Sequence, residues 1–310
     1  MTEEIIYELP GLYRDALRVR GFSFGQGKKA CCIVGAMRGN EVQQLYVASQ
    51  LVKRLAEEES EGRLLSGKIL VIPAVNPYSL NISKRFWPTD NTDINRMYPG
   101  YDLGETTQRI AAGVFREIED YPFGVQLASF YMPGTYVPHT RVMDAGYPVN
   151  LEYAKQFGMP YVVLRNTRPY DTTTLNYNWQ IWGCHAVSLY TTTTTTIDKD
   201  SAQQAVRAIL RFLSAQGILT YHGHGGYVSR VINDRDMIQI RPKCAGFFDS
   251  HVRVGFEVKK GKNLGRIIDP LTGEIIEKLT SPVDGIVFFQ HSNPLTYADT
   301  AVFKLIPLED

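Results

Sequence analysis

The stretch KKACCIVGAMRGNEVQQLYVASQLVKRLAEEE, residues 28–59, joins three features in one continuous run. Its first part, KKACCIVGAM, is apolar and predicts a buried strand. The segment GAMRGNE, residues 35–41, is a glycine turn that carries Glu41 into the next element. From there apolar residues recur near helical spacing, which predicts a helix. A buried strand, a turn and a helix are the start of an α/β fold, in which ligand and catalytic groups collect where strands end.

Strand and helix patterns alternate as far as about residue 220. Further buried strands are predicted at GKILVIPAVNP, FGVQLASF, PYVVLR and CHAVSLY, and further helices at TTQRIAAGVFREIE, EYAKQFG and SAQQAVRAILRFLSAQGIL. The alternation predicts a sheet covered by helices on both faces. The six-threonine run at residues 191–196 is interpreted as a loop or an extension of the last strand.

Two segments depart from this alternation. A long loop is predicted at residues 78–104, and loops of this length are usually functional or disordered. Because this loop contains large aromatic side chains, we expect it to be ordered. After TYHGHGG, short strand patterns and turn signals replace helical ones to the end of the chain. We therefore predict an α/β domain over residues 1–222 and a small all-β, barrel-like domain over residues 223–310.

The composition is that of a soluble globular protein. The 310 residues are 44% hydrophobic and 21% charged, with 33 basic and 32 acidic side chains and a net charge of +1. This balance argues against nucleic acid or an anionic membrane as a partner. The sequence contains no apolar run of transmembrane length and no signal peptide, so we expect a cytoplasmic protein. The four cysteines do not have the spacing of a disulfide framework or a zinc knuckle.

Several residues could carry chemistry. Glu41 lies at a strand end, although it would also favour a helix N-terminus by charge–dipole attraction. Arg85, Asn95 and Arg96 fall in the long loop, and arginines beside an asparagine suit recognition of a carboxylate; ordinary surface ion pairs are the alternative.

The histidines give a weaker signal. His222 and His224 in YHGHGG are interpreted as part of a linker, because no acidic or cysteine partner stands at a metal-binding spacing. His139 and His185 are single histidines, typical of hydrogen-bonded structural positions.

These motifs resemble the succinylglutamate desuccinylase/aspartoacylase family, which has a zinc-carboxypeptidase-like, mixed-sheet α/β fold. The turn AMRGNE follows the family pattern G-x-H-G-x-E, with Arg38 in the histidine position. Asn76-Pro77, Arg85 and DINRMYPG at residues 93–100 follow the family's substrate-binding motifs. The segments GFEVKKGKNLGRIIDPLTGE and LTSPVDGIVFF resemble its C-terminal β-domain.

The resemblance implies a zinc amidohydrolase, but three of its four central positions carry other residues. Glu41 matches the zinc-binding glutamate. Arg38 and Ala128 stand where the two zinc-binding histidines are expected, Gln126 stands in place of an aspartate, and Tyr190 replaces the catalytic glutamate. Arginine stays protonated, alanine has no donor atom, and tyrosine is a poor base at neutral pH. We therefore expect no cofactor, and an ion pair between Arg38 and Glu41 in the metal's place.

The substrate-binding positions remain. Arg85, Asn95 and Arg96 match the family's carboxylate-binding residues, and Arg141 falls where the family often has another basic residue. The first hypothesis is a degenerate member, a pseudoenzyme that binds a small acidic or N-acyl amino-acid-like ligand. It would act by ligand binding or as the partner subunit of an active relative, in a homo-oligomer or a heteromer.

Two alternatives remain open. One is an active zinc deacylase of N-acyl amino acids that recruits His139, His185 or His222 as metal ligands. The other is a metal-free enzyme using Tyr190 as an acid or Cys184 as a nucleophile. Cys184 and His185 are adjacent, so on a strand their side chains would face opposite ways.

Overall fold

The computed structural model describes residues 1–11, 15–143 and 149–308. The chain divides into two compact units. The first comprises residues 1–129 and 138–231, and the second comprises residues 130–137 and 232–310. The second unit thus takes in a short segment from the middle of the chain, which the sequence pattern did not indicate.

The described part of the first unit is built on a mixed nine-stranded sheet, in the order β1-β2-β4-β3-β5-β9-β7-β8-β10. The central strands β4, β3, β5 and β9 are parallel to one another, whereas β1 and β2 pair antiparallel and β7 runs antiparallel to β9. The strands are β1 Thr2–Leu9, β2 Leu17–Phe24, β3 Lys29–Ala36, β4 Lys68–Ala74, β5 Phe123–Ala128, β7 His139–Met143, β8 Tyr161–Arg165, β9 His185–Tyr190 and β10 Arg230–Asn233.

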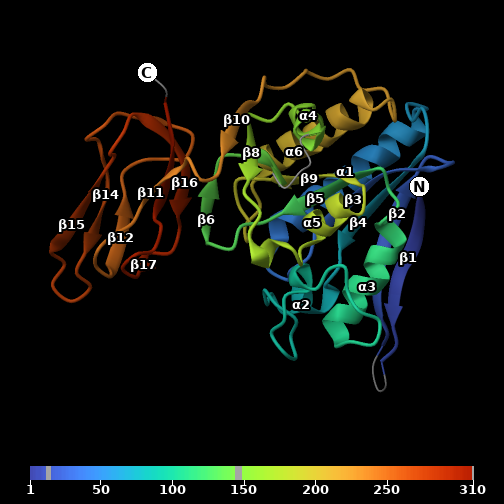
Figure 1. The fold of residues 1–310 in the computed structure, drawn as a ribbon, viewed down its shortest axis with the longest axis horizontal. Helices are drawn as coiled ribbons and strands as arrows, with labels where there is room; N and C mark the ends of the chain where they lie inside the picture. Colours follow the sequence, from blue (N-terminus) through green and yellow to red (C-terminus); the bar gives the residue numbers. More distant parts are fainter. Residues whose placement is uncertain (12–14, 144–148, 309–310) are drawn as a thin grey trace. The chain divides into compact units, whose positions relative to one another are not determined.

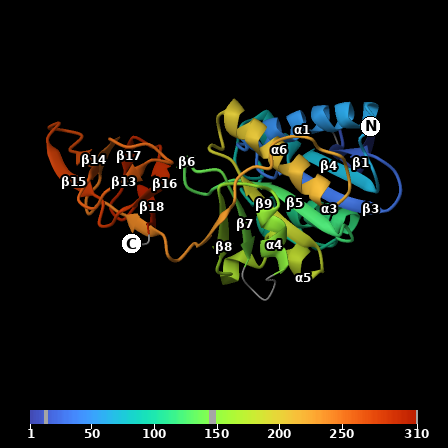
Figure 2. The ribbon, with the colours of Figure 1, turned by 90° about the horizontal axis from the view of Figure 1, so that it is seen from above.

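Helices cover both faces of this sheet, as the sequence predicts (Figures 1 and 2). Side chains of α1, α4 and α6 share one hydrophobic cluster, and side chains of α3 and α5 share another. The helices are α1 Val42–Ser60, α2 Pro77–Asn81, α3 Thr106–Ile118, α4 Val149–Lys155, α5 Leu175–Ile181 and α6 Lys199–Ala215.

Strand β3 shows why the opening stretch decides this arrangement. Cys31 and Ile33 belong to the cluster under α1 and α6, whereas Cys32 and Val34 belong to the cluster under α3 and α5. Alternate side chains of a strand point to opposite faces, so a continuous apolar run is buried on both sides. The end of β3 therefore lies in the middle of the sheet, with the turn to α1 at the carboxyl ends of the parallel strands.

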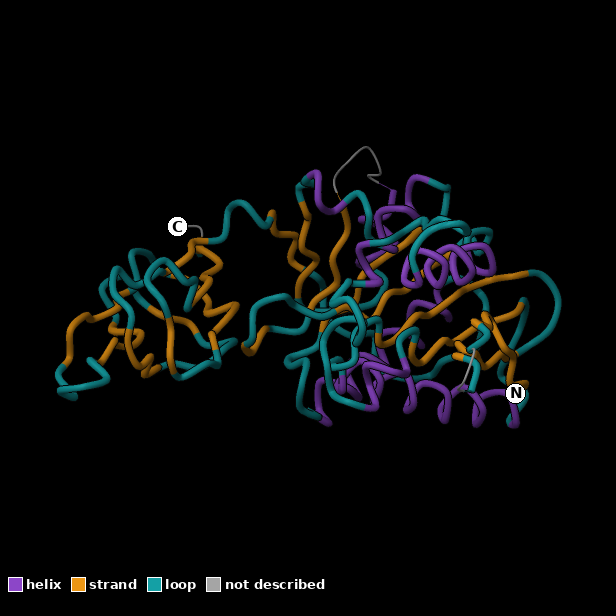
Figure 3. The backbone as a smooth tube through the Cα atoms, turned by 90° about the horizontal axis from the view of Figure 1, so that it is seen from below, coloured by secondary structure: helices purple, strands orange, loops and turns teal. Residues whose placement is uncertain are grey.

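The second unit consists of strands and loops throughout residues 232–308, which confirms the predicted all-β character (Figure 3). Its strands are β6 Gly134–Tyr136, β11 Ile238–Ile240, β12 Gly246–Ser250, β13 Glu257–Val258, β14 Asn263–Ile268, β15 Ile275–Thr280, β16 Gly285–His291, β17 Leu295–Thr296 and β18 Phe303–Pro307. Strand β6 joins this unit by pairing with β16.

The structure differs from the sequence expectations in several details, and β7 and α5 are among the elements that the sequence pattern did not indicate. The segment from residue 78 is not wholly a loop, because α2 and a 3₁₀ turn at Ile94–Arg96 lie within it; Trp87 and Tyr98 are buried, so the segment is ordered as expected. The β1–β2 pair was not predicted, and β1, TEEIIYEL, shows no strict alternation of apolar and charged residues. Within the described ranges no helix has the length and hydrophobicity to span a membrane.

Candidate functional site

The turn between β3 and α1 is packed closely against the loop that follows α2. A Cβ atom on Gly39 would lie 2.2 Å from the carbonyl oxygen of Ser79 and 2.3 Å from that of Lys84. The Gly39 N–H also donates to the Arg85 carbonyl at 3.3 Å. Glycine is therefore required at position 39, because the two backbones approach closely. The same approach places Asp93, farther along that loop, next to Arg38.

Arg38 is buried between two carboxylates. Its Nη1 lies 2.9 Å from Glu41 Oε1, while Nε and Nη2 form a bidentate pair with Asp93 at 3.0 and 2.8 Å. The Arg38 side chain is 7% exposed. Burial alone would lower the pKa of Arg38, but attraction to Glu41 and Asp93 outweighs it and raises the pKa. The guanidinium therefore stays charged at any physiological pH, and the predicted Arg38–Glu41 ion pair is present.

Glu41 uses both carboxylate oxygens within this cluster. Oε2 accepts hydrogen bonds from the backbone N–H groups of Met37 and Arg38 at 2.7 and 3.1 Å. Oε1 accepts from the Ser129 hydroxyl as well as from Arg38. Glu41 precedes α1, but its side chain forms no capping hydrogen bond with the helix. Its carboxylate therefore stabilises the turn and not the start of the helix.

The residues around Glu41 do not fit a zinc ion. A structural or catalytic zinc site needs three or four neutral or anionic ligands, whereas Glu41 faces a permanent cation on one oxygen and N–H donors on the other. Ala128 offers no ligand atom. Across the described ranges, no cluster of three or more His, Cys, Asp or Glu side chains could hold a metal.

Tyr190 lies one strand away from this cluster. It pairs with Ala128 between β9 and β5, and Ser129 follows Ala128 directly. The Tyr190 hydroxyl accepts from Arg141 Nη1 at 3.1 Å, and the guanidinium carbon lies 4.4 Å from the ring centroid. The His139 ring stacks on the Tyr190 ring, and the two ring centroids lie 4.8 Å apart. The structure thus brings Arg141 and His139 to Tyr190.

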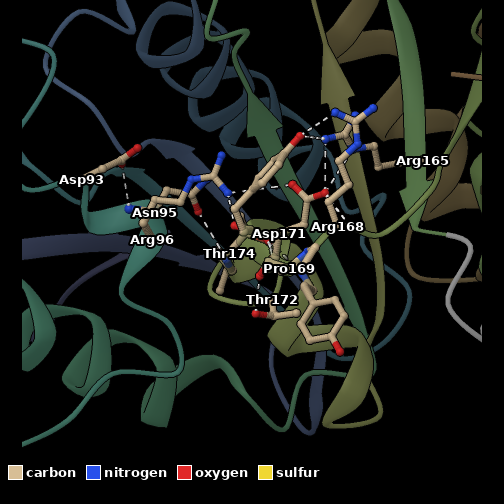
Figure 4. Close-up of polar contacts among 12 residues, drawn as sticks. Asp93, Asn95, Arg96, Arg165, Arg168, Pro169, Asp171, Thr172 and Thr174 are labelled. Atoms are coloured by element: carbon tan, nitrogen blue, oxygen red, sulfur yellow. Dashed lines mark hydrogen bonds and ion pairs between the residues drawn. The ribbon is translucent and has the colours of Figure 1, made fainter. Parts of the chain in front are cut away.

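Asn95 links the 3₁₀ turn to the sheet. Its Oδ1 accepts from Gln126 Nε2 at 3.2 Å and from the Leu175 N–H at 3.3 Å. The turn itself begins at Asp93, whose Oδ1 accepts from the Asn95 N–H (Figure 4). Asp93 therefore fixes Arg38 and the start of the turn together.

Arg96 points toward a second arginine cluster (Figure 4). Its guanidinium lies 3.8 Å from Asp171, and Arg165 reaches the same carboxylate at 3.2 Å. The Arg168 N–H also donates to Asp171, and its side chain donates to the Tyr170 hydroxyl at 2.8 Å. The guanidinium groups of Arg96 and Arg165 thus share the buried Asp171 carboxylate, and the Arg96 side chain is 34% exposed.

The other predicted residues lie elsewhere. The Arg85 guanidinium stacks on Phe86 at 5.6 Å. His185 stands at the start of β9, whereas Tyr190 ends it; its Nδ1 contacts Asn150, and burial lowers its pKa. Strand rise separates these two positions by about 17 Å. His222 is exposed and lines a separate cavity beside α1 and α6.

Cys184 is poorly suited to act as a nucleophile. It is 3% exposed, it precedes β9 at the end opposite Tyr190, and burial raises its pKa well above the ordinary value. A thiolate is the reactive form, so the environment disfavours the metal-free cysteine mechanism.

Sequence reasoning missed several members of these clusters. Asp93 lies within the motif DINRMYPG, and its charge close to Arg96 in that motif was the available signal. Ser129 directly follows Ala128. Arg165, Arg168 and Asp171 form a spaced basic–acidic run in LRNTRPYD, but nothing in sequence alone places that run beside Arg96.

Taken together, the mixed sheet, the glycine turn and the arginine-bearing loop define a carboxypeptidase-like α/β protein. The model of the succinylglutamate desuccinylase/aspartoacylase catalytic domain matches residues 27–216. The chain belongs to this family.

Solved structures share the whole fold. A succinylglutamate desuccinylase from Silicibacter sp. TM1040 superposes with a TM-score of 0.85 at 19% identity, covering 99% of this chain and 95% of that one. The product-bound ectoine utilization protein EutE (DoeB) from Ruegeria pomeroyi superposes with a TM-score of 0.81 at 19% identity, covering 98% and 94%.

One curated relative is similar in sequence. The N-alpha-acetyl-L-2,4-diaminobutyric acid deacetylase of Halomonas elongata is 26% identical over 147 residues, which is 45% of this chain. The match spans 41% of that relative's length.

Proposed function

We propose that this protein is a family member that binds a small acidic or N-acyl amino-acid-like ligand without zinc-dependent amide hydrolysis. The observation that carries the proposal is the Arg38 guanidinium, which lies between Glu41 and Asp93. It supplies a fixed positive charge to the carboxylate that would otherwise bind zinc. The Arg38 guanidinium, in place of a metal ion, would then stabilise the turn between β3 and α1.

The ligand-binding part of the proposal rests on the cluster of Arg96, Arg165 and Arg168. The guanidinium groups of Arg96 and Arg165 contact Asp171, and Arg168 contributes its backbone N–H to the same carboxylate. The Arg96 side chain is 34% exposed, and guanidinium groups bind carboxylates bidentately. A ligand carboxylate would bind here, with Arg141 near Tyr190 as a further basic contact.

The role of such a protein would be ligand-dependent association, as the partner subunit of an active relative or in a homo-oligomer. A cytoplasmic location is part of the same proposal, and the four cysteines are present as thiols rather than disulfides.

The second candidate is an active deacylase of N-acyl amino acids. Its support is the similarity to a deacetylase and the position of His139, which stacks on Tyr190. His139 is the recruited histidine that the geometry favours, since His185 lies at the far end of β9 and His222 lines another cavity.

The two candidates are separated by one pair of measurements on the full chain. N-succinylglutamate is titrated calorimetrically, and its hydrolysis is followed with and without added Zn²⁺. Binding without hydrolysis in either condition supports the first candidate. Zinc-dependent hydrolysis that is abolished in a His139→Gln variant supports the second and overturns the first.

A further inference from the structure

A cavity of about 790 Å³ lies along α6, outside the clusters around Arg38 and Arg96. Its volume falls in the range of small-molecule sites, about 300–1,000 Å³. Its charged lining consists of Arg54, Arg63, Arg207, Arg211, Glu58 and Asp200. Arg54 follows Glu41 by thirteen residues on α1, which is about 20 Å of helix. The cavity is therefore remote from the turn between β3 and α1.

Only some of the arginines that line this cavity form ion pairs with carboxylates. Arg54 and Arg63 both contact Glu58, which is buried and so neutralised by them. Arg207 is exposed on α6 and makes no hydrogen bond or ion pair with the described residues. Arg207 and Arg211 stand four positions apart and so share a helix face.

Arg211 is held in place by backbone oxygens rather than by a carboxylate. Its Nε donates to the Phe157 carbonyl at 2.9 Å, and its Nη atoms donate to the carbonyls of His224 and Gly158 at 3.4 Å. Burial lowers the pKa of Arg211, and the like charge of Arg207 adds to this. Two adjacent cations without an acidic partner favour an anion.

Two glycines shape the backbone around Arg211. A Cβ on Gly226, whose φ is +84°, would lie 2.9 Å from both Cζ and Nε of Arg211. A Cβ on Gly158, whose φ is +61°, would lie 2.9 Å from the same Nε. The neighbouring backbone N–H groups of residues 223–226 donate to none of the described residues, and such groups in a glycine-rich segment suit an anion.

We propose that this cavity is a second binding site, for a small phosphate-bearing anion held by Arg207, Arg211 and the backbone of residues 223–226. Phosphate presents several acceptor oxygens, which match a pair of guanidinium groups together with N–H donors. The source is either inorganic phosphate or a phosphate monoester. The segment YHGHGG, interpreted from sequence as a linker, would then be part of the site.

The test is calorimetric titration of the full chain with inorganic phosphate and, separately, with AMP as a phosphate monoester, at constant ionic strength set by chloride. We expect saturable binding of at least one, and an increase of about tenfold in its dissociation constant in Arg207→Gln, since loss of one charged hydrogen-bond partner has this order of effect. Tighter binding of AMP would identify a phosphate monoester as the ligand, and equal binding would identify phosphate itself.

The matched control is Arg109→Gln. Arg109 is an exposed arginine of α3, on the other face of the sheet, and its loss should leave the dissociation constant unchanged. Gly226→Ala should weaken binding by displacing Arg211, and circular dichroism checks that this variant is folded. No saturable binding of either probe, or equal weakening in the Arg207 and Arg109 variants, would overturn the proposal.

Discussion

The two arginine clusters of the first unit differ in how their charges are balanced. Around Arg38 one buried cation faces two carboxylates, and Glu41 also accepts from backbone N–H groups and from Ser129. Around Asp171 the guanidinium groups of Arg96 and Arg165 share one buried carboxylate, which also accepts from the Arg168 backbone N–H. The first cluster is satisfied by its own side chains and suits a structural role. In the second, Arg96 is 34% exposed and Arg168 is exposed, so this cluster is accessible to a ligand.

The largest effect is expected from Arg38→Met. Removing the cation leaves Glu41 and Asp93 buried without their partner, and breaking a buried ion pair in this way costs about 3–5 kcal/mol. Urea denaturation measures the free energy of unfolding. The control Arg109→Gln should change it by less than about 0.5 kcal/mol. A loss below about 1 kcal/mol in Arg38→Met would show that the cluster is not a structural ion pair.

Arg96→Gln should act on binding rather than on folding. We expect the dissociation constant for N-succinylglutamate to rise about tenfold, because a charged hydrogen bond contributes about 1.5–3 kcal/mol. The free energy of unfolding should change by less than about 1 kcal/mol, since partly exposed ion pairs contribute little. The reverse pattern, lost stability with unchanged binding, would place Arg96 with Arg38 in the structural class.

Ser129→Ala tests how completely the first cluster satisfies Glu41. The variant removes one donor to a buried carboxylate, and we expect a loss of about 1–2 kcal/mol in unfolding free energy. Arg38 and the two N–H groups still hold Glu41, so the effect is smaller than that of Arg38→Met. Additivity of the Ser129 and Arg38 variants in a double-mutant cycle would contradict a shared network.

The smallest effect concerns pH. Arginines do not titrate near neutrality, so pH dependence there should come from histidines. Burial lowers the pKa of His185 in the folded state; the unfolded chain then binds more protons, and stability falls as pH falls through about 6.5. His185→Gln should flatten the slope of unfolding free energy between pH 7.5 and 5.5. Burial also lowers the pKa of His291, so some slope should remain, whereas an unchanged slope would exclude His185 as a contributor.

Much of this arrangement could be predicted from local sequence. The apolar run of β3 and the helical periodicity of α1 specify their own structures and the turn between them. The Arg38–Glu41 pair was predicted from the family resemblance, which places Arg38 in a zinc-binding histidine position beside Glu41. Strand β1 escaped prediction because its sequence, TEEIIYEL, lacks the strict apolar–polar alternation that marks a half-buried strand.

The contacts that sequence missed are long-range. Asp93 reaches Arg38 across 55 positions, and Ser129 reaches Glu41 across 88. Arg165 and Arg96 meet only because β8 and the 3₁₀ turn both approach Asp171. Single-sequence patterns carry little information about which distant segments approach one another, so the second acidic partner of Arg38 could not be placed.

The most direct test of the central claim is the zinc content of the protein. The full chain, purified from zinc-supplemented medium without chelators, is measured by mass spectrometry together with Glu41→Ala. Because Arg38 occupies the carboxylate that would bind the metal, we predict far less than one zinc per chain in both proteins. One tightly bound zinc per chain that is lost in Glu41→Ala would contradict this account.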